Sequence, residues 1–360
     1  MTIIDRYVLR QFLATLGFAV MALVVIFIVI DLLENLDEFL DQQAPLEVIL
    51  RYYVYFVPNT LRLMLPVSML LAALFSVGRL SGNNEVTAMR SGGQSLPRFM
   101  LPVLITAMVI SAGQLYFNGW IVPLANAKKL AIERTYLGKS SSGVALYRLY
   151  FRDIPTRSVA IESYDPDGRV GRNIAIETYA DTIHPRVVER YDAPDMIWDS
   201  TSARWRLRQA VRRTFHGDTI TFERLRDVNA PFTIRHEQLV RLQRSMAEMS
   251  FDDVRDHLET LRKGGKNTRS QEIAYLSEWS LPFANFIVVL IAIPFASVRR
   301  RGGIAAQIAA AMAISFVYIA FTLVGQAWGV ASSWSTPVVA WSANVLFLVV
   351  GIVNLVRTRS

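Results

Sequence analysis

The sequence has no cysteine and few charged residues. Of its 360 residues, 19% are charged and 52% are hydrophobic, and the mean hydropathy is +0.30. The missing cysteines exclude a disulfide-stapled domain and a thiolate-ligated metal centre. The high apolar content excludes intrinsic disorder and is unusual for a soluble enzyme. The distribution of the few charges therefore indicates how the chain is organised.

Long stretches carry no charge at all. Phe12–Ile30 is uncharged and, at about 1.5 Å per residue, is long enough to cross about 30 Å of hydrocarbon. A cleaved signal peptide is the alternative, since Arg6 and Arg10 precede this stretch. The apolar run exceeds the usual core of a signal peptide, however, and no small-residue cleavage site precedes Asp31. We therefore expect a retained first membrane helix.

Five further spans follow from the same reasoning. They are Tyr52–Val77, Phe99–Val122, Trp279–Val298 and two helices within the uncharged Gly302–Val356, which the Trp328–Pro337 segment divides with a turn. The sequence thus predicts a polytopic α-helical membrane protein with six transmembrane helices. Three helices precede a polar block and three follow it.

Basic residues gather on one predicted side of the membrane. These are Arg6, Arg10, Arg79, Arg90, Arg98, Arg299, Arg300, Arg301, Arg357 and Arg359. The loop after the first helix lies on the opposite side and is acidic. Because short cytoplasmic loops are enriched in arginine and lysine, we expect both termini to be cytoplasmic and the polar block to lie outside.

The polar block reads as a β-rich domain. The expected domains are 1–127 with helices one to three, 128–274 with the strands, and 275–360 with helices four to six. Alternating or β-branched runs at 144–151, 158–163, 173–179, 205–211 and 219–222 are separated by the turn-like DPDG, DAPD and HGD. This pattern favours a β-sandwich or roll. Ser250 then begins a helix that stops at Gly264 and Gly265.

Motifs for catalysis are missing from the sequence. Gly138-Lys139-Ser140 resembles the end of a Walker A loop, but Glu133 stands where the loop requires glycine. The histidines are scattered and have no accompanying carboxylate cluster; they are His184, His216, His236 and His257. We expect no enzyme, no metal and no cofactor. Since the predicted spans contain no acid, any transport would draw its energy from another protein.

The expected cytoplasmic loop after the second helix has a definite form, RLSGNNEVTAMRSGG at 79–93. Asn84 can cap a short helix, Glu85 suits its first turn, and Gly92 would end it. Val86 and Met89 are three residues apart and would form an apolar knob. On the residues alone, a self-stabilised loop helix explains this run as well as a docking site does.

This loop, with Leu65-Pro66 before it and Leu101-Pro102 after it, resembles the LptF/LptG (YjgP/YjgQ) family of permease subunits of the lipopolysaccharide export ABC transporter. Other matching runs are Asp5-Arg6-Tyr7, Leu281-Pro282-Phe283, Ile293-Pro294-Phe295, Arg301-Gly302-Gly303 and Trp341-Ser342-Ala343-Asn344. The resemblance covers the membrane part and its three-plus-three layout. The outer block matches in size and β character, as an inserted periplasmic β-jellyroll-like domain between helices three and four.

The resemblance implies a function and a set of partners. The family extracts lipopolysaccharide from the bacterial inner membrane and passes it to a periplasmic bridge. Implied partners are a homologous second permease, a cytoplasmic ABC ATPase dimer, a periplasmic β-jellyroll bridge protein and a single-helix inner-membrane component, with no nucleic acid. The alternatives are a non-transporting scaffold that anchors a periplasmic β domain and a permease of a lipoprotein-release system. The three-plus-three layout argues against the second alternative.

The resemblance also assigns roles to particular residues. The helix near 84–92 would be the coupling helix that docks on the ATPase, through Glu85, Val86, Met89 and Arg90. Basic residues after the third span, Lys128, Lys129 and Arg134, match positions near the lipid phosphates, although ordinary solvated charge is the alternative. The exit of the first helix departs from the family pattern of basic residues, because it carries Asp31, Glu34, Asp37 and Glu38.

Arg62 is the remaining candidate for substrate binding. It lies about ten residues into the second span, near the midplane, where exposure to lipid would cost about 2.5–3.5 kcal/mol or more. It should therefore face protein or a wet cavity. Pro58 and Pro66 free the backbone carbonyls of Val54 and Arg62 for water or a side chain. A purely structural role is as compatible with this position as substrate contact.

Overall fold

The computed structural model describes residues 2–137, 146–166, 168–183, 185–217, 219–242, 245–297 and 303–357. The chain forms two compact units: a helical unit of Met1–Ile132 and Arg269–Ser360, and a sheet unit of Glu133–Thr268. Each unit has its own apolar core. The Gly138-Lys139-Ser140 run, His184 and the arginines at 299–301 lie outside the described residues.

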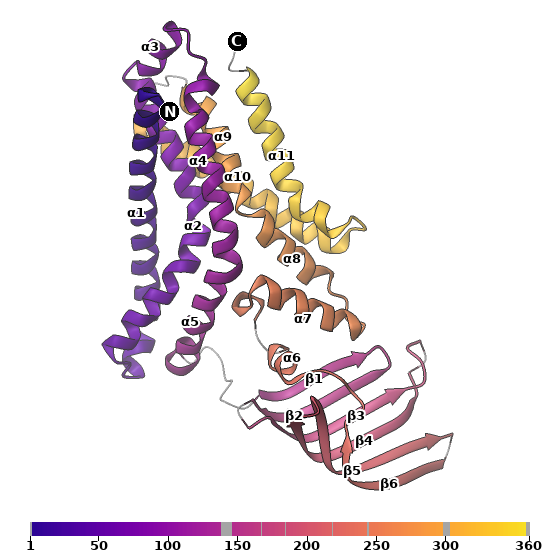
Figure 1. Cartoon of the computed structure of the whole chain (residues 1–360). Helices are drawn as coiled ribbons and strands as arrows, with labels where there is room; N and C mark the ends of the chain where they lie inside the picture. The colour runs from indigo at the N-terminus through magenta and orange to yellow at the C-terminus, as the bar shows by residue number, and fades with distance from the viewer. Residues whose placement is uncertain are drawn as a thin grey trace. The chain divides into compact units, whose positions relative to one another are not determined.

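Long apolar helices build the helical unit (Figure 1). They are α1 (Ile3–Asp41), α2 (Leu46–Gly82), α4 (Leu96–Tyr116) continued by a π-helical turn (Phe117–Ile121) into α5 (Val122–Tyr136), α8 (Arg269–Ser280), α9 (Phe283–Ser297), α10 (Gly303–Ala331) and α11 (Thr336–Arg357); the short α3 (Glu85–Ser91) joins α2 to α4. In the described part of the chain, five helices are long and apolar enough to cross a membrane, or six if the bent pair α8–α9 is one span. The prediction of a polytopic helical protein is confirmed, and the count of six depends on that pair.

Most helices extend beyond the spans predicted from charge. Helix α1 continues from Ile30 through the acidic stretch to Asp41, and α5 continues from Val122 to Tyr136. The physical reason is that charge marks the edge of the hydrocarbon, whereas a helix ends where its backbone hydrogen bonding ends. Helices α5 and α8 consequently run across the divisions expected after residues 127 and 274.

The pair α8–α9 is bent by 54° at a short break. The break contains Pro282, which has no backbone N–H and cannot continue the helical ladder. Helix α9 is enclosed almost all round, since every residue from 287 to 294 is buried. It packs with α2 and α4 in the core of the helical unit. A helix that is apolar on every face requires such enclosure.

Six antiparallel strands form a single sheet in the sheet unit (Figure 1). They are β1 (Leu146–Ile154), β2 (Arg157–Asp165), β3 (Val170–Tyr179), β4 (Val187–Asp199), β5 (Arg204–His216) and β6 (Thr219–Asn229), paired in sequence order. The β character predicted for this block is confirmed. The described strands make one meander, and the jellyroll-like topology stays a prediction.

Strand β4 was missed by the sequence analysis, which assigned its DAPD run to a turn. The run lies inside the strand, and the ladders pair Ala193 with Ile174 and Asp195 with Arg172, so Pro194 is skipped. Asn173 and Gln209, on the two neighbouring strands, have φ angles of 51° and 50°. The backbone is thus irregular around Pro194, whose missing N–H leaves a gap in the ladder, while the pairing register continues unchanged on both sides.

Two short helices, α6 (His236–Arg241) and α7 (Phe251–Lys263), complete the sheet unit. The Ser250 side chain accepts a hydrogen bond from the N–H of Asp253, and Gly264 is the C-cap, so the predicted limits of α7 are confirmed. A Cβ on Gly264 would lie 2.2 Å from the carbonyl oxygen of Arg152. Only glycine lets the end of α7 approach strand β1 this closely.

Candidate functional site

Helix α3 presents a carboxylate whose position is fixed. The side-chain amide of Asn83 donates a hydrogen bond of 3.0 Å to Oε1 of Glu85, and Tyr7 on α1 lies near this carboxylate. Glu85 is half-buried, so a partner approaching from outside can still reach it. Helix α3 lies at the same end of the helical unit as the start of α1 and the end of α11 (Figure 1).

The apolar side of α3 faces inward. Val86 is 4% exposed and belongs to the core shared by α2, α4 and α9, and Met89 packs against the same core. The predicted apolar knob thus anchors α3 to its own chain. The outward face carries Thr87 and Arg90, which are exposed and flank Glu85. A partner protein that docks on α3 would therefore contact polar side chains, while Val86 holds the helix against the core.

The caps of α3 agree only in part with the sequence. Gly92 is the C-cap, as predicted. Asn84 occupies the N-cap position, but in the left-handed conformation (φ 62°) and without a side-chain capping hydrogen bond to the described helix. The predicted cap is therefore wrong, and asparagine is suited here because it tolerates the left-handed region better than most residues.

The Asp5-Arg6-Tyr7 run also has a structural role. The Asp5 carboxylate accepts a hydrogen bond of 2.8 Å from the N–H of Thr2, which completes a capping box at the start of α1. It also lies 3.5 Å from Arg98 near the start of α4. These contacts hold α1 beside the loop that contains α3, and Tyr7 then reaches Glu85.

Lys128 and Lys129 lie against aromatic rings of α2. The Nζ of Lys128 is 5.2 Å from the ring centre of Tyr55, and that of Lys129 is 5.4 Å from Phe56 and 5.9 Å from Tyr52. Cation–π contacts of this kind contribute about 0.5–2 kcal/mol and hold a cation without neutralising it. Both lysines are therefore held against α2 by these ring contacts.

Arg134 is engaged within the sheet unit. Its guanidinium lies 2.6 Å from Oε1 of Glu248, whose side chain is 3% exposed. Glu248 also belongs to the capping box of the turn that begins at Ser245. Because its charge is matched by this buried carboxylate, Arg134 is poorly suited to hold a phosphate.

The acidic exit of the first helix is part of α1 itself. Glu34, Asp37 and Glu38 are exposed on the helix surface, whereas Asp31 is half-buried. The amide of Asn35 donates to the carbonyl oxygen of Asp31 one turn earlier. The departure from the basic family pattern is thus an ordinary exposed helical surface of negative charge.

Arg62 faces protein, as predicted. Its guanidinium lies 2.9 Å from Oε1 of Glu278 on α8, and the two side chains are 19% and 33% exposed. The amide of Gln114 on α4 donates a hydrogen bond of 3.0 Å to the carbonyl oxygen of Arg62, and Asn285 on α9 in turn donates to Gln114. Four helices therefore meet in one polar network.

The spans drawn from the sequence contain no acid, but the bent pair α8–α9, taken as one span, includes Glu278, which lies beside Arg62. The sequence reasoning also missed Tyr7, Gln114 and Asn285. The last two are amides inside otherwise apolar stretches. Polar residues inside a membrane cost free energy and are usually paired with another polar group. A single amide within an apolar stretch is therefore the sequence signal that would have identified Gln114 and Asn285.

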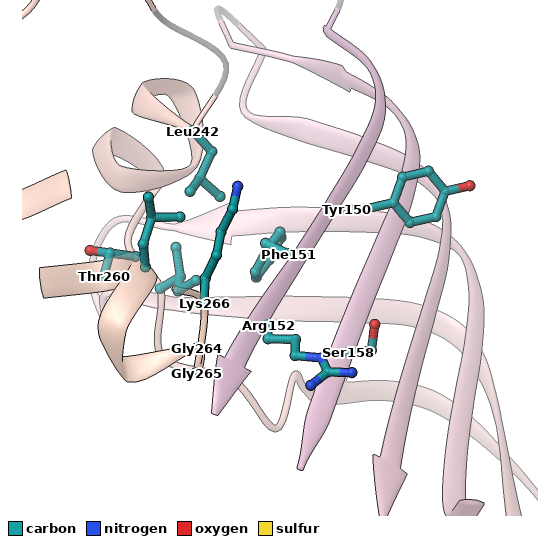
Figure 2. Close-up of a pocket in the computed structure, with 11 residues that line it drawn as sticks. Tyr150, Phe151, Arg152, Ser158, Leu242, Thr260, Gly264, Gly265 and Lys266 are labelled. Carbon is teal, nitrogen blue, oxygen red and sulfur yellow. The ribbon is translucent and has the colours of Figure 1, made fainter. Parts of the chain in front are cut away.

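A groove in the sheet unit lies between strand β1 and the helices α6 and α7. It has a volume of about 460 Å³, and its lining includes Phe151, Leu242, Leu261 and Lys266. Figure 2 shows Phe151 directed toward Lys266, while Tyr150 points away from the groove. The groove thus combines an apolar wall with two cationic side chains, Arg152 and Lys266.

Comparison with known families gives one match. A family model described as "Lipopolysaccharide export system permease LptF/LptG" matches residues 6–357, nearly the whole chain. The match includes both units, so the sheet belongs to the same family pattern as the helices. No curated protein is significantly similar to the chain in sequence.

Proposed function

This chain belongs to the LptF/LptG family of lipopolysaccharide export permeases, and we propose that it is one of two homologous permease subunits driven by a separate cytoplasmic ATPase dimer. The family is a transport component of the inner membrane. The proposed complex extracts lipopolysaccharide from that membrane and passes it to a periplasmic bridge.

The observation that carries this proposal is the geometry of Glu85. An exposed short helix, anchored from beneath by Val86, holds a carboxylate between Asn83 and Tyr7. A carboxylate held in this way is ready for a charge-assisted hydrogen bond from an arginine or lysine of the ATPase. Because Val86 belongs to the core that α2, α4 and α9 share, movement of the ATPase would be passed to that core.

The proposed orientation places the α3 end of the helical unit in the cytoplasm. The start of α1 and the end of α11 lie at that end (Figure 1), and arginines 6, 10, 79, 90 and 98 belong to the start of α1, the end of α2, α3 and the start of α4. The acidic end of α1 and the lysines of α5 would then lie at the periplasmic surface. This arrangement satisfies the positive-inside rule.

The proposed phosphate contacts are Lys128 and Lys129. Their cations lie over aromatic rings of α2. Arg134 would contribute less, since Glu248 already pairs with it. Contact of Arg62 with substrate stays a prediction, and its pairing with Glu278 makes a phosphate an unsuitable group there.

We assign the sheet unit to the hand-over of lipid to the bridge protein. Strand β6 is an edge of the sheet, and Ile220 and Phe222 on it are 46% and 67% exposed. An open edge with exposed apolar side chains supports pairing with a strand of a second jellyroll-like domain. The single-helix component of the family would join the complex in the membrane.

Affinity purification of the chain in mild detergent tests the proposal. An ATPase, a second permease and bound glycolipid should be recovered together. The scaffold alternative predicts recovery of the chain without an ATPase and full tolerance of substitutions at residues 83–93. The lipoprotein-release alternative concerns a different family, and the match over residues 6–357 leaves it without support.

A further inference from the structure

The ion pair between Arg62 and Glu278 leaves two polar atoms unused. Nη2 of Arg62 contacts Oε1 of Glu278, but Nε of Arg62 and Oε2 of Glu278 are buried and have no hydrogen-bond partner among the described residues. A buried polar atom without a partner is costly in an apolar environment. The unused donor of Arg62 and the unused acceptor of Glu278 together indicate a binding site for another molecule.

These residues line a cavity of about 330 Å³ within the helical unit. Helix α10 supplies Ser315, Thr322 and Gln326 as further polar groups, and α2 and α8 supply the ion pair. Three apolar lining residues, Leu63, Ile319 and Leu323, are 49%, 49% and 60% exposed on the surface of the unit. The cavity therefore has a polar end and an apolar side that opens where lipid chains would lie.

We propose that this cavity binds an uncharged, hydroxyl-bearing amphiphile with a single acyl chain. The hydroxyl would donate to Oε2 of Glu278 and accept from Nε–H of Arg62, which satisfies both unused atoms with one group. The chain would leave past Leu63 and Leu323. The volume lies within the range of small-molecule sites.

Charge argues for an uncharged ligand. The guanidinium and the carboxylate are 2.9 Å apart, so their charges cancel locally. A phosphate placed here would gain Arg62 but would also meet Glu278 at close range, where like charges repel strongly in low dielectric. This property separates the cavity from Lys128 and Lys129, which lie over aromatic rings of α2.

Photo-crosslinking with two matched probes tests the inference. The probes are 1-monooleoylglycerol and 1-oleoyl lysophosphatidic acid, each with a diazirine in the oleoyl chain, applied to the purified full chain in phosphatidylcholine nanodiscs. The uncharged probe should label residues 315–326 about tenfold more than the anionic probe does, the effect of one hydrogen bond to a charged group. Excess unlabelled 1-monooleoylglycerol should remove this labelling. Neither lipopolysaccharide nor the ATPase is needed, so the result is independent of the proposed transport.

Two variants sharpen the test. Glu278→Gln leaves Arg62 with an uncompensated charge, so the preference should invert toward the anionic probe. The double change Arg62→Met with Glu278→Met removes both charges together, which buried pairs tolerate better than single changes, and should lower labelling by the uncharged probe about tenfold. Glu47→Gln breaks an exposed ion pair with Arg51 elsewhere on α2 and is the matched control.

Folding of each variant is checked by gel filtration and thermal melting, and the comparison of probes on the wild-type chain requires no variant. Equal labelling by both probes, or labelling outside 315–326 only, would overturn the proposal. The cavity would then hold water. Inversion in Glu278→Gln with an unchanged Glu47→Gln would support it.

Discussion

The side-chain amide of Gln114 donates a hydrogen bond of 3.0 Å to the carbonyl oxygen of Arg62. In an uninterrupted helix this carbonyl would accept from the N–H of residue 66, which is a proline. Gln114 on α4 therefore supplies from another helix the hydrogen bond that Pro66 removes from α2. A long apolar helix can in this way retain a proline near its middle.

Gln114→Leu should accordingly destabilise the helical unit by about 0.6–2 kcal/mol, the range for hydrogen bonds between membrane helices. The cost should shrink in a Pro66→Ala background, because alanine restores the backbone donor to the Arg62 carbonyl. Thermal melting of the four proteins of this double-mutant cycle in detergent gives the coupling energy. Equal costs in the two backgrounds would contradict the account.

The sequence could predict features that depend on neighbouring residues. The carbonyl freed by Pro66, the end of α3 at Gly92 and the limits of α7 all follow from local chemistry. Strand β4 could not be predicted, because Pro194 interrupts its local pattern and the pairing on both sides of it comes from the neighbouring strands β3 and β5. The partner of Arg62 lies 216 residues away in sequence and was likewise out of reach of local patterns.

Charge reversal of Lys128 and Lys129 together, each to glutamate, should reduce the glycolipid that copurifies with the complex. The expected loss grows at low salt, since exposed charges are screened within about 8 Å at physiological ionic strength. Mass spectrometry of the extracted lipid measures it. Each single reversal should have a small effect, because exposed charge pairs contribute only about 0–1 kcal/mol.

Arg134→Ala provides the contrast. It leaves Glu248 buried without its partner, so it should lower the stability of the sheet unit rather than the amount of bound lipid. If the double lysine reversal recovers as much lipid as the wild type, Lys128 and Lys129 do not bind the lipid phosphates and are ordinary solvated charges.

His236 should make the stability of the sheet unit depend on pH. Its Nδ1 contacts the hydroxyl of Tyr164, and burial, assisted by the charge of Arg169, lowers the pKa of His236 below its ordinary value near 6.5. As the pH falls, His236 therefore binds a proton at a higher pH in the unfolded chain than in the folded chain. The stabilisation is present above pH 6.5 and is lost as the pH falls from there through the lowered folded value.

His236→Gln keeps a hydrogen-bonding side chain but cannot titrate in this range. Its urea midpoint, followed by tryptophan fluorescence of the full chain in detergent, should fall less between pH 7.5 and 5.5 than that of the wild type. An identical fall in both proteins would assign the pH dependence to other groups.

Cysteines introduced into this cysteine-free chain test the orientation. A cysteine at Ser91, the last residue of α3, should resist a membrane-impermeant maleimide in spheroplasts, and one at Ser163 on β2 should react. Ser360 lies outside the described residues, and a cysteine there should resist as Ser91 does. Reaction of the cysteine at position 91 in intact spheroplasts would contradict the proposed orientation and favour the opposite one.

The most direct test of the central claim is ATP-driven removal of lipopolysaccharide from proteoliposomes that contain the complete complex with this chain. Glu85→Lys reverses the charge at the proposed ATPase contact, while Glu47→Gln changes an exposed carboxylate at the other end of α2. The account predicts that Glu85→Lys abolishes export or releases the ATPase, while the chain stays in the membrane and Glu47→Gln exports normally. Export by Glu85→Lys at the wild-type rate would contradict it.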